Sequence, residues 1–394
     1  MLDFKCLFKV SLFSLFVFLS INNSFANIYK CFVSGKTIYT SIPCTSSSTP
    51  LIVSTISPSS TTTSNPVAVT SISPTTTITS TSLPANALIT DGIFKSTSFW
   101  YNPIPATVAL HPNSENFVKE FVRQKTAFYN NVIINTYSYS SPVYIADGNL
   151  STVPVGYNNC QHKTWVDPVY LNMMTPMPIP KYAQQSAGSD HEMVIYQPST
   201  HTMWEMWGVV KNSTGNWYSC WGGRILNTSD SLGINQKSYG TTATGLPFLG
   251  GQVTAEELAR GEIKHAIGIA LVDVEKSSIY SWPANRSDGW NPYNVPNRIA
   301  EGQRFRLNPS VNVDSLPMTK AGKVIAKAAQ KYGFVVWDKA GSISIRAQNA
   351  LSYTALGKPN PYPALYENKP SYAVLNGFPW DQLQFLPINY GKPL

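Results

Sequence analysis

The chain has 394 residues and a formal net charge of +8, yet only 13% of its residues are charged. Lysine and arginine are scattered without a basic run, so we expect no nucleic-acid partner. The five histidines are dispersed, and the sequence has no HExxH, Walker, GxGxxG or GxSxG pattern. We therefore predict no metal, no cofactor and no serine-hydrolase site. Aromatic residues reach 12%, which favours an exported β-protein with sugar-stacking surfaces.

The N-terminus has the pattern of a secretory signal. Lys5 and Lys9 precede an apolar run over 10–19, and small residues at Ser24 and Ala26 form a cleavage site. A membrane anchor is the alternative, but spanning a bilayer needs roughly 20 apolar residues. We predict a signal peptide over 1–26 and a mature protein, secreted or periplasmic, without a transmembrane segment.

Four cysteines remain after the signal, because Cys6 leaves with it. An even set in an exported chain predicts disulfides, and four cysteines allow three pairings. Cys31 and Cys44 lie in one short segment, and Cys160 and Cys220 lie beyond a Ser/Thr/Pro tract. We predict bridges within these two pairs, since the spacing offers no CxxC for a zinc site or a catalytic thiol.

Residues 27–44 read as two short strands around a turn at Ser34-Gly35-Lys36. So small a hairpin cannot bury enough apolar surface to be stable alone, and a disulfide would supply the missing stability. Its Tyr-x-Cys, central Gly, aromatic-x-Ser and Pro-Cys ending resemble the DUF4124 module of exported bacterial proteins. Residues 45–84 are nearly all Ser, Thr and Pro, which predicts a disordered linker. Residues 85–394 are expected to form one large domain.

Three helices are predicted in the large domain. Apolar residues at helical spacing predict a helix over 114–129. Thr254 and Glu257 form a capping-box pattern, with Gly261 as a left-handed stop. The third helix is expected over 319–332, ending before Gly333.

Strand signals dominate the rest. A meander is predicted over 192–196, 203–207 and 217–221, followed by strands at 263–272, 278–282 and 304–307 and a hairpin of 334–337 with 342–346. Short strands separated by Gly, Pro and Asn turns are typical of an antiparallel β-sandwich or jelly roll. We therefore expect a mainly β fold.

The candidate catalytic residues lie among the meander strands. Asp190 and His191 precede its first strand, and Glu205 lies beside an aromatic residue on the second. Arg224 follows a Gly-Gly pair, which permits a bulge or a close backbone approach. Glu205 could act as acid or base, or be a strand carboxylate that faces solvent or pairs with an arginine. Arg224 could clamp a substrate carboxylate, or form an ion pair with Glu205 or Asp190.

His265 lies in a strand whose two faces differ. Ile267, Ile269 and Leu271 share its face, which favours a hydrogen-bonded core histidine, with a catalytic role as the other hypothesis. The opposite face carries small residues, such as Gly268, which would let a neighbouring element or an extended ligand approach closely.

Segments spread over the large domain together resemble a group of exported bacterial proteins, a resemblance that implies a shared architecture and no particular reaction. These segments are Ser189–His191, Met203–Glu205, Trp221–Arg224, Thr244–Pro247, Gly261–Ala266, Trp282–Ala284 and Gly302–Leu307.

Two functions are weighed. The first is a protein that engages a polysaccharide and cleaves it as a hydrolase or lyase. The second is a non-enzymatic surface module presented by the linker. We expect a monomer in either case. The residues predicted to hold substrate are Tyr196, Trp204, Trp207, Trp221 and Arg304.

Overall fold

The computed structural model describes residues 29–33, 36–40, 92–146 and 148–393. The chain divides into two units, Met1–Ile78 and Thr79–Leu394. The expected signal peptide, the whole of the expected linker, Cys44 and the side chain of Cys31 lie outside the described residues. The Cys31–Cys44 bridge therefore stays a prediction.

The first unit contains the expected hairpin. Strands β1 (Tyr29–Val33) and β2 (Lys36–Thr40) pair antiparallel, with Val33 opposite Lys36 at the turn.

In the second unit, the described residues form three sheets from thirteen strands. The six-stranded sheet has the order β15 (Leu383–Phe385), β12 (Arg304–Leu307), β13 (Phe334–Lys339), β11 (Ile267–Leu271), β14 (Ser344–Arg346), β3 (Ile133–Asn135). The four-stranded sheet has the order β10 (Trp221–Ile225), β7 (Thr202–Trp207), β6 (Met193–Gln197), β4 (Val143–Ile145). The three-stranded sheet has the order β5 (Val155–Tyr157), β9 (Trp217–Ser219), β8 (Val210–Lys211).

The α-helices of this unit, within the described residues, are mostly short. They are α1 (Ser114–Ala127), α2 (Pro168–Met174), α3 (Phe248–Gly251), α4 (Ala255–Arg260), α5 (Lys320–Lys331), α6 (Leu351–Thr354) and α7 (Tyr362–Leu365). Helices α1 and α5 match the expected spans. Helix α4 has the predicted capping box at Thr254 and Glu257, and Gly261 ends it at φ 83°.

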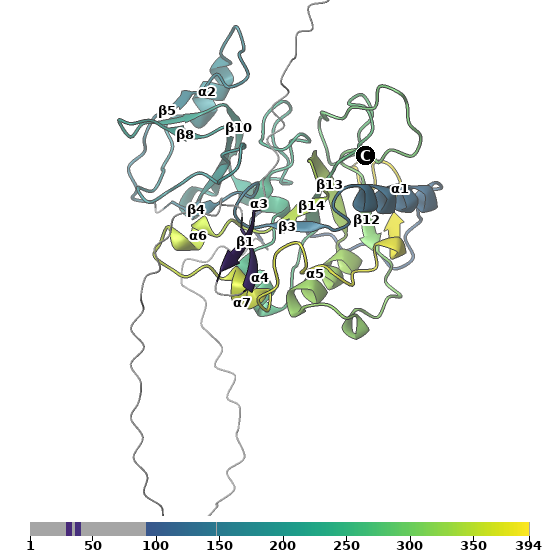
Figure 1. Ribbon diagram of the computed structural model, residues 1–394. Helices are drawn as coiled ribbons and strands as arrows, with labels where there is room; N and C mark the ends of the chain where they lie inside the picture. Colours follow the sequence, from purple (N-terminus) through teal and green to yellow (C-terminus); the bar gives the residue numbers. More distant parts are fainter. Residues whose placement is uncertain (1–28, 34–35, 41–91, 147, 394) are drawn as a thin grey trace, which may run out of the picture. The chain divides into compact units, whose positions relative to one another are not determined.

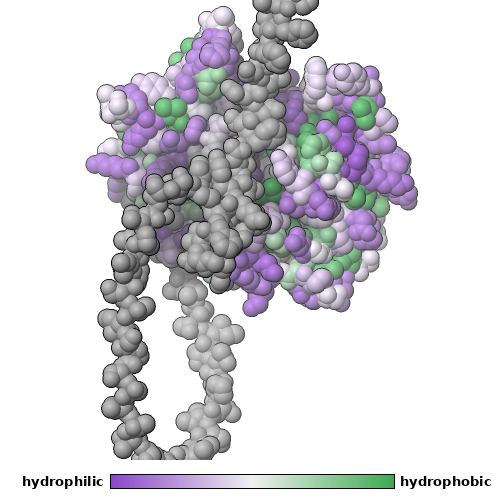
Figure 2. Space-filling model, viewed as in Figure 1, coloured by the Kyte–Doolittle hydropathy of each residue, from purple (hydrophilic) through white to green (hydrophobic). Residues whose placement is uncertain are grey.

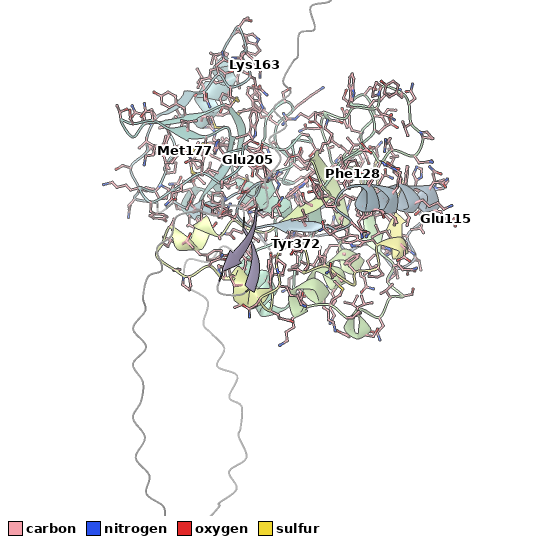
Figure 3. The ribbon with its side chains drawn as sticks, in the orientation of Figure 1. Glu115, Phe128, Lys163, Met177, Glu205 and Tyr372 are labelled. Atoms are coloured by element: carbon pink, nitrogen blue, oxygen red, sulfur yellow. A yellow bond between two sulfur atoms is a disulfide. The ribbon has the colours of Figure 1, made fainter. Side chains whose placement is uncertain are left out.

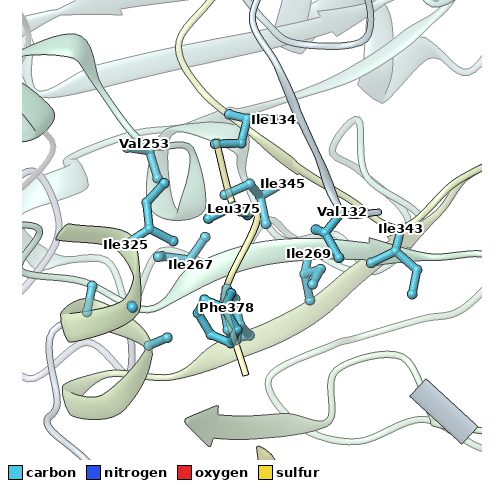
Figure 4. Close-up of a cluster of buried hydrophobic side chains, with 14 of the residues drawn as sticks. Val132, Ile134, Val253, Ile267, Ile269, Ile325, Ile343, Ile345, Leu375 and Phe378 are labelled. Carbon is cyan, nitrogen blue, oxygen red and sulfur yellow. The ribbon is translucent and has the colours of Figure 1, made fainter. Parts of the chain in front are cut away.

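The largest core lies between the six-stranded sheet and helices α1, α4, α5 and α7 (Figure 1). Alternate β11 residues, Ile267 and Ile269, pack there with Ile345 of β14 and Ile325 of α5 (Figure 4). Because side chains alternate along a strand, the other face of the sheet carries a different set of residues, including Val335 and Trp337.

That other face packs against the four-stranded sheet. Val194, Met203 and Ile225 of the four-stranded sheet share a core with Val335 and Trp337. The reverse face of the four-stranded sheet packs on α2 and the three-stranded sheet. The second unit is therefore layered, with helices, six-stranded sheet, four-stranded sheet and a small outer sheet in succession.

The Cys160–Cys220 disulfide is present, as predicted, with an S–S distance of 2.08 Å. Cys220 separates β9 from β10, so the strand expected over 217–221 is two short pieces that belong to different sheets. On the face shown in Figure 2, hydrophilic residues predominate and hydrophobic ones form small groups. None of the described helices is long and apolar enough to cross a membrane.

The expectation of antiparallel sheets is wrong in detail, although the unit is rich in β-strands. Four strand pairs are parallel: β11 with β13, β14 with β3, β4 with β6, and β5 with β9. The predicted hairpin of β13 and β14 does not form, because β11 lies between them. The strand expected over 278–282 is reduced to one bridge, Tyr280 with Glu301. Strand periodicity identifies strands but says nothing of partners far away in the sequence.

Candidate functional site

Charged side chains gather between the two large sheets, where an apolar core would be the simplest packing. We call this group the intersheet polar cluster; it comprises Glu192, Glu205, Arg286, Asp288, Glu301, Asp338 and Arg346. Carboxyl groups outnumber guanidinium groups in it. Burying charge is costly unless the charge is paired or removed by protonation, so such a cluster indicates either a structural network or a functional site.

Glu192 and Arg346 form the central ion pair. Arg346 Nη1 donates to both carboxylate oxygens of Glu192, and the Ser141 hydroxyl donates to Oε2 at 3.1 Å. The Arg346 guanidinium also lies over the Phe248 ring, 4.4 Å from its centroid. Burial raises the pKa of Glu192 above its ordinary value, although Arg346 opposes this. Arg346 is thereby held between Glu192, which directly precedes β6, and Phe248 of α3.

Asp338 is the partly exposed acid of the cluster, with 18% of its side chain accessible. Its Oδ2 lies 3.8 Å from Arg346 Nη2, and its Oδ1 accepts from the Lys339 N–H at 2.9 Å. Burial raises its pKa to about 7 against the effect of Arg346, and Asp288 raises it further. Asp338 is thus a carboxyl that changes charge near neutral pH while in contact with solvent.

A β-bulge explains why Asp338 faces the cluster. Ile269 pairs with Val336 and Ala270 pairs with Asp338, so Trp337 is an extra residue in β13. Bulges let two consecutive side chains leave a strand on the same side and are frequent beside active sites. Trp337 packs between the two sheets, and Asp338 reaches Arg346 on that side.

Glu205 lies inside the cluster with no exposed surface, and Figure 3 labels it within the body of the unit. Its Oε1 accepts from Asn235 Nδ2 at 2.7 Å and the Thr241 N–H at 3.2 Å, and its Oε2 accepts from the Phe248 N–H at 3.0 Å. Burial raises its pKa to about 7, although these hydrogen bonds lower it. The carboxyl holds the 235–248 segment against β7, which is a structural task.

The predicted close approach at the glycine pair is part of this arrangement. A Cβ on Gly223 would lie 2.5 Å from Asn235 Oδ1 and 2.8 Å from the Gly240 nitrogen. Only glycine therefore lets the 235–240 segment come near enough for Asn235 to reach Glu205.

Arg286 and Glu301 complete the cluster near the 240–245 segment. Arg286 donates to the carbonyls of Gly240, Thr242 and Ala243 at 2.7–3.0 Å, so its hydrogen bonds go to backbone. Glu301 is buried and accepts from the Asp288 N–H at 3.1 Å. Burial raises the pKa of Glu301 to about 8. Asp288 is exposed, so this part of the cluster reaches the protein surface.

Of the predicted catalytic residues, Asp190 lies near the cluster. It is half-buried, accepts from Trp207 Nε1 at 3.4 Å, and contributes to raising the pKa of Glu192. His191 follows it with φ 44°, and its Nδ1 lies 3.3 Å from the Ser186 carbonyl. Both residues therefore remain accessible.

Arg224 and His265 lie elsewhere. In the register of β7 and β10, Glu205 is opposite Gly223 and Trp204 is opposite Arg224, so Glu205 and Arg224 leave opposite faces of the sheet. Arg224 donates to the Asn172 carbonyl at 3.4 Å. The structure therefore does not bring Asp190, Glu205, Arg224 and His265 around one concavity.

His265 is fully buried in a polar pair of its own. Its Nε2 lies 3.0 Å from Glu257 Oε1, and its Nδ1 lies 2.8 Å from the Ala266 carbonyl. Both ring nitrogens lie near acceptors, and an imidazole can donate from both nitrogens only when it is positively charged. The carboxylate that pairs with it is the one that caps α4, which gives His265 a structural task.

The small-residue face of this strand is filled by protein. A Cβ on Gly268 would lie 2.2 Å from the Trp337 ring, and one on Gly251 of α3 would lie 2.8 Å from the Gly268 nitrogen. A neighbouring element, rather than a ligand, occupies this face.

The predicted substrate-holding residues are mostly engaged within the protein. Tyr196 and Trp204 are buried, and Trp204 Nε1 donates to the Met173 carbonyl at 3.1 Å. Trp221 stacks with Tyr170 and Tyr239 and lies under Lys163. Trp207 remains half-buried beside Asp190.

Arg304 is also buried, at 2% exposure. Its Nη2 donates to the Tyr332 carbonyl at the C-terminal end of α5, and its guanidinium lies over the Tyr390 ring. A cation at a helix C-terminus is stabilised by the helix dipole, which accounts for a buried arginine here without a substrate.

Sequence reasoning missed Arg286, Asp288, Glu301, Asp338 and Arg346. One signal was available: Arg346 follows Ile343 and Ile345 at the alternation that puts it on the opposite face of a buried strand. A charge in that position indicates a buried partner. The partner itself lies 154 positions away, at Glu192, and no local pattern identifies it.

No family model, curated protein or solved structure matches this chain. Among the side chains that the structure describes, no group of three or more His, Cys, Asp or Glu could hold a metal ion. The case for a function therefore depends on the cluster alone.

Proposed function

We propose that this protein is an exported enzyme that cleaves a polysaccharide, with Asp338 as its general acid. The observation that carries the proposal is a partly exposed carboxyl whose pKa is raised to about 7, beside a buried ion pair. A general acid works best when its pKa lies near the working pH. The Cys160–Cys220 disulfide is consistent with an oxidising compartment.

Glycosidic bonds are cleaved by two carboxyl groups in different protonation states. Asp338 would supply the proton to the leaving oxygen. Asp288 is the exposed carboxyl whose charge raises the pKa of Asp338, and it would act as the base or nucleophile. Arg346 would keep Asp338 oriented, since Glu192 fixes its guanidinium on the other side.

The test is to incubate the purified full chain with neutral and uronate polysaccharides, measuring new reducing ends and the ultraviolet absorbance of unsaturated products. Reducing ends without unsaturation indicate a hydrolase. Unsaturation indicates a lyase. Asp338→Asn should lower kcat by about 10²–10⁴-fold, the contribution typical of a general acid. The matched control is Asp381→Asn, because Asp381 is an exposed carboxylate in a different part of the fold.

Absence of both products for every polymer, or an Asp338→Asn variant as active as the Asp381→Asn control, contradicts the proposal. The second candidate, a binding module without catalysis, is favoured by one observation: Glu205, a candidate acid or base, is fully buried. Binding of a glycan without either product would support that candidate.

A further inference from the structure

The connection between β11 and β12 exposes large aromatic rings. Over 272–303 it contains neither helix nor regular strand, and Trp290 and Tyr293 are 73% and 88% exposed. Ile279 and Tyr280 of the same segment are 45% and 39% exposed. Four large exposed side chains thus fall within one connection, and exposed apolar side chains that concentrate in one part of a surface indicate an interaction site. We call residues 275–298 the aromatic loop.

The aromatic loop is braced from inside by one buried amide. Asn291, 5% exposed, donates from Nδ2 to Glu275 Oε1 at 3.1 Å and to the Val295 carbonyl at 3.0 Å. Its Oδ1 accepts from the Val295 N–H at 2.9 Å. Tyr293 therefore lies on a turn whose two ends are tied together.

The backbone next to Trp290 is fixed in a similar way. The preceding residue, Gly289, packs so closely that a Cβ there would lie 1.8 Å from the Glu275 carbonyl oxygen. The Gly289 carbonyl also accepts from the Ser277 N–H at 2.9 Å. A surface whose backbone is already ordered loses less conformational entropy on binding, so these rings are pre-organised for a partner.

Both arginines of the aromatic loop are engaged within the protein. Arg298 pairs with Glu120 and Asp273, and Lys276 is an exposed cation that donates to the neutral Asn294 amide at 3.1 Å. Arg286 donates to backbone carbonyls. A nucleic acid or an anionic membrane would need free cations beside the rings. The surface suits instead an uncharged partner with an apolar face and polar edges, as a pyranose ring has.

The aromatic loop also joins the proposed catalytic centre. Asp288 precedes Trp290 by two positions, and its N–H donates to Glu301 of the intersheet polar cluster. The rings of the aromatic loop therefore lie in the same segment as Asp288, the exposed carboxyl of the proposed catalytic centre.

We propose that Trp290 and Tyr293 form a binding platform for the sugar rings of a neutral polysaccharide. This inference rests on the proposed function for its substrate class, and it names the subsite that holds the polymer. The Trp290→Ala/Tyr293→Ala variant removes both rings while leaving Asn291 and Gly289 in place. The matched control is Trp165→Ala/Tyr137→Ala, since these rings are 57% and 58% exposed elsewhere on the unit.

Binding is measured by affinity electrophoresis of the full chain in gels containing soluble glucans, mannans, xylans or a uronate polymer. We expect the Trp290→Ala/Tyr293→Ala variant to bind the neutral polymer at least about tenfold more weakly, because each lost ring contact costs affinity. The control should bind like the unmodified protein. Circular dichroism checks that each variant folds.

Equal binding by the platform variant and the control overturns the inference. So does binding confined to the uronate polymer or to phosphatidylglycerol vesicles, or no binding to any polymer. The two proposals fail separately. If Asp338→Asn loses cleavage while the platform variant and its control bind the polymer equally well, the proposed function alone is supported. If the platform variant loses binding and no variant or unmodified protein cleaves the polymer, this inference alone is supported.

Discussion

The buried pair of His265 and Glu257 gives a sharp test of how this fold is stabilised. Both side chains have no exposed surface. Glu257 Oε1 contacts His265 Nε2, while Glu257 Oε2 accepts from the Thr254 N–H and hydroxyl, each at 2.9 Å. Burial acts to raise the pKa of Glu257, but the His265 charge and the Thr254 hydrogen bonds hold it below its ordinary value of 4.5. The two charges therefore depend on each other.

Two substitutions should differ in cost. His265→Ala leaves a buried carboxylate without its cation, and removing one member of a buried pair costs about 3–5 kcal/mol. Glu257→Gln keeps the shape and the oxygen that accepts from Thr254. Its amide can donate to Nε2 of a neutral imidazole, which keeps its Nδ1 proton on the Ala266 carbonyl. We expect this change to cost about 1–2 kcal/mol, the range for one altered hydrogen bond.

The assay is urea unfolding of each variant, with the disulfide intact, followed by circular dichroism at pH 7 and pH 4. Because the pKa of Glu257 is lowered by folding, its ionised form adds stability above pH 4.5 that is lost as pH falls through the folded value. In Glu257→Gln the buried imidazole is neutral, so protonation of this histidine in the unfolded chain, which sets in below about pH 6.5, destabilises the variant. The difference between the unmodified protein and Glu257→Gln should therefore grow between pH 7 and pH 4. The reasoning is refuted if the two substitutions cost the same within about 1 kcal/mol at pH 7, the typical net value of one hydrogen bond.

Three further outcomes are expected. Replacing Cys160 and Cys220 by Ser should lower the free energy of unfolding by about 2–4 kcal/mol, measured by urea unfolding, because the bridge closes a loop with a sequence separation of 60. Gly223→Ala should cost about 1–3 kcal/mol in the same assay, because the added methyl would overlap Asn235; an unchanged midpoint would contradict the close approach. The kcat of the proposed reaction should fall as pH rises above about 7, since Asp338 then loses its proton; a rate that keeps rising to pH 9 would exclude it as the acid.

Local signals predicted the parts of the fold that depend on nearby residues. The helix cap at Thr254, the stop at Gly261 and the strands around the turn before His201 all form where expected. The glycine pair at 222–223 permits the close approach that its composition suggested. Each of these features is set within a few positions, so the sequence nearby contains enough information to specify it.

Pairing between distant strands could not be read in the same way. The parallel pair of β11 and β13 joins residues more than sixty positions apart, and β11 separates two strands that a short loop connects. Burial of Glu205 was hidden for a related reason: its partners Asn235, Thr241 and Phe248 come from a segment that a strand pattern does not place. A carboxylate on an alternating strand looks the same whether solvent or protein covers it.

The bulge at Trp337 determines which face of the six-stranded sheet carries Asp338. Phe334 and Val336 point into the core beneath the helices, while Val335 and Trp337 point toward the other sheet. Strict alternation would return Asp338 to the helix-covered core, among its buried hydrophobic side chains. The bulge at Trp337 shifts the alternation by one, so Asp338 meets Arg346 instead. Because a carboxylate buried among apolar side chains would be strongly unfavourable, the cation of Arg346 and the bulge stabilise each other, and together they create the partly exposed acid on which the proposed function depends.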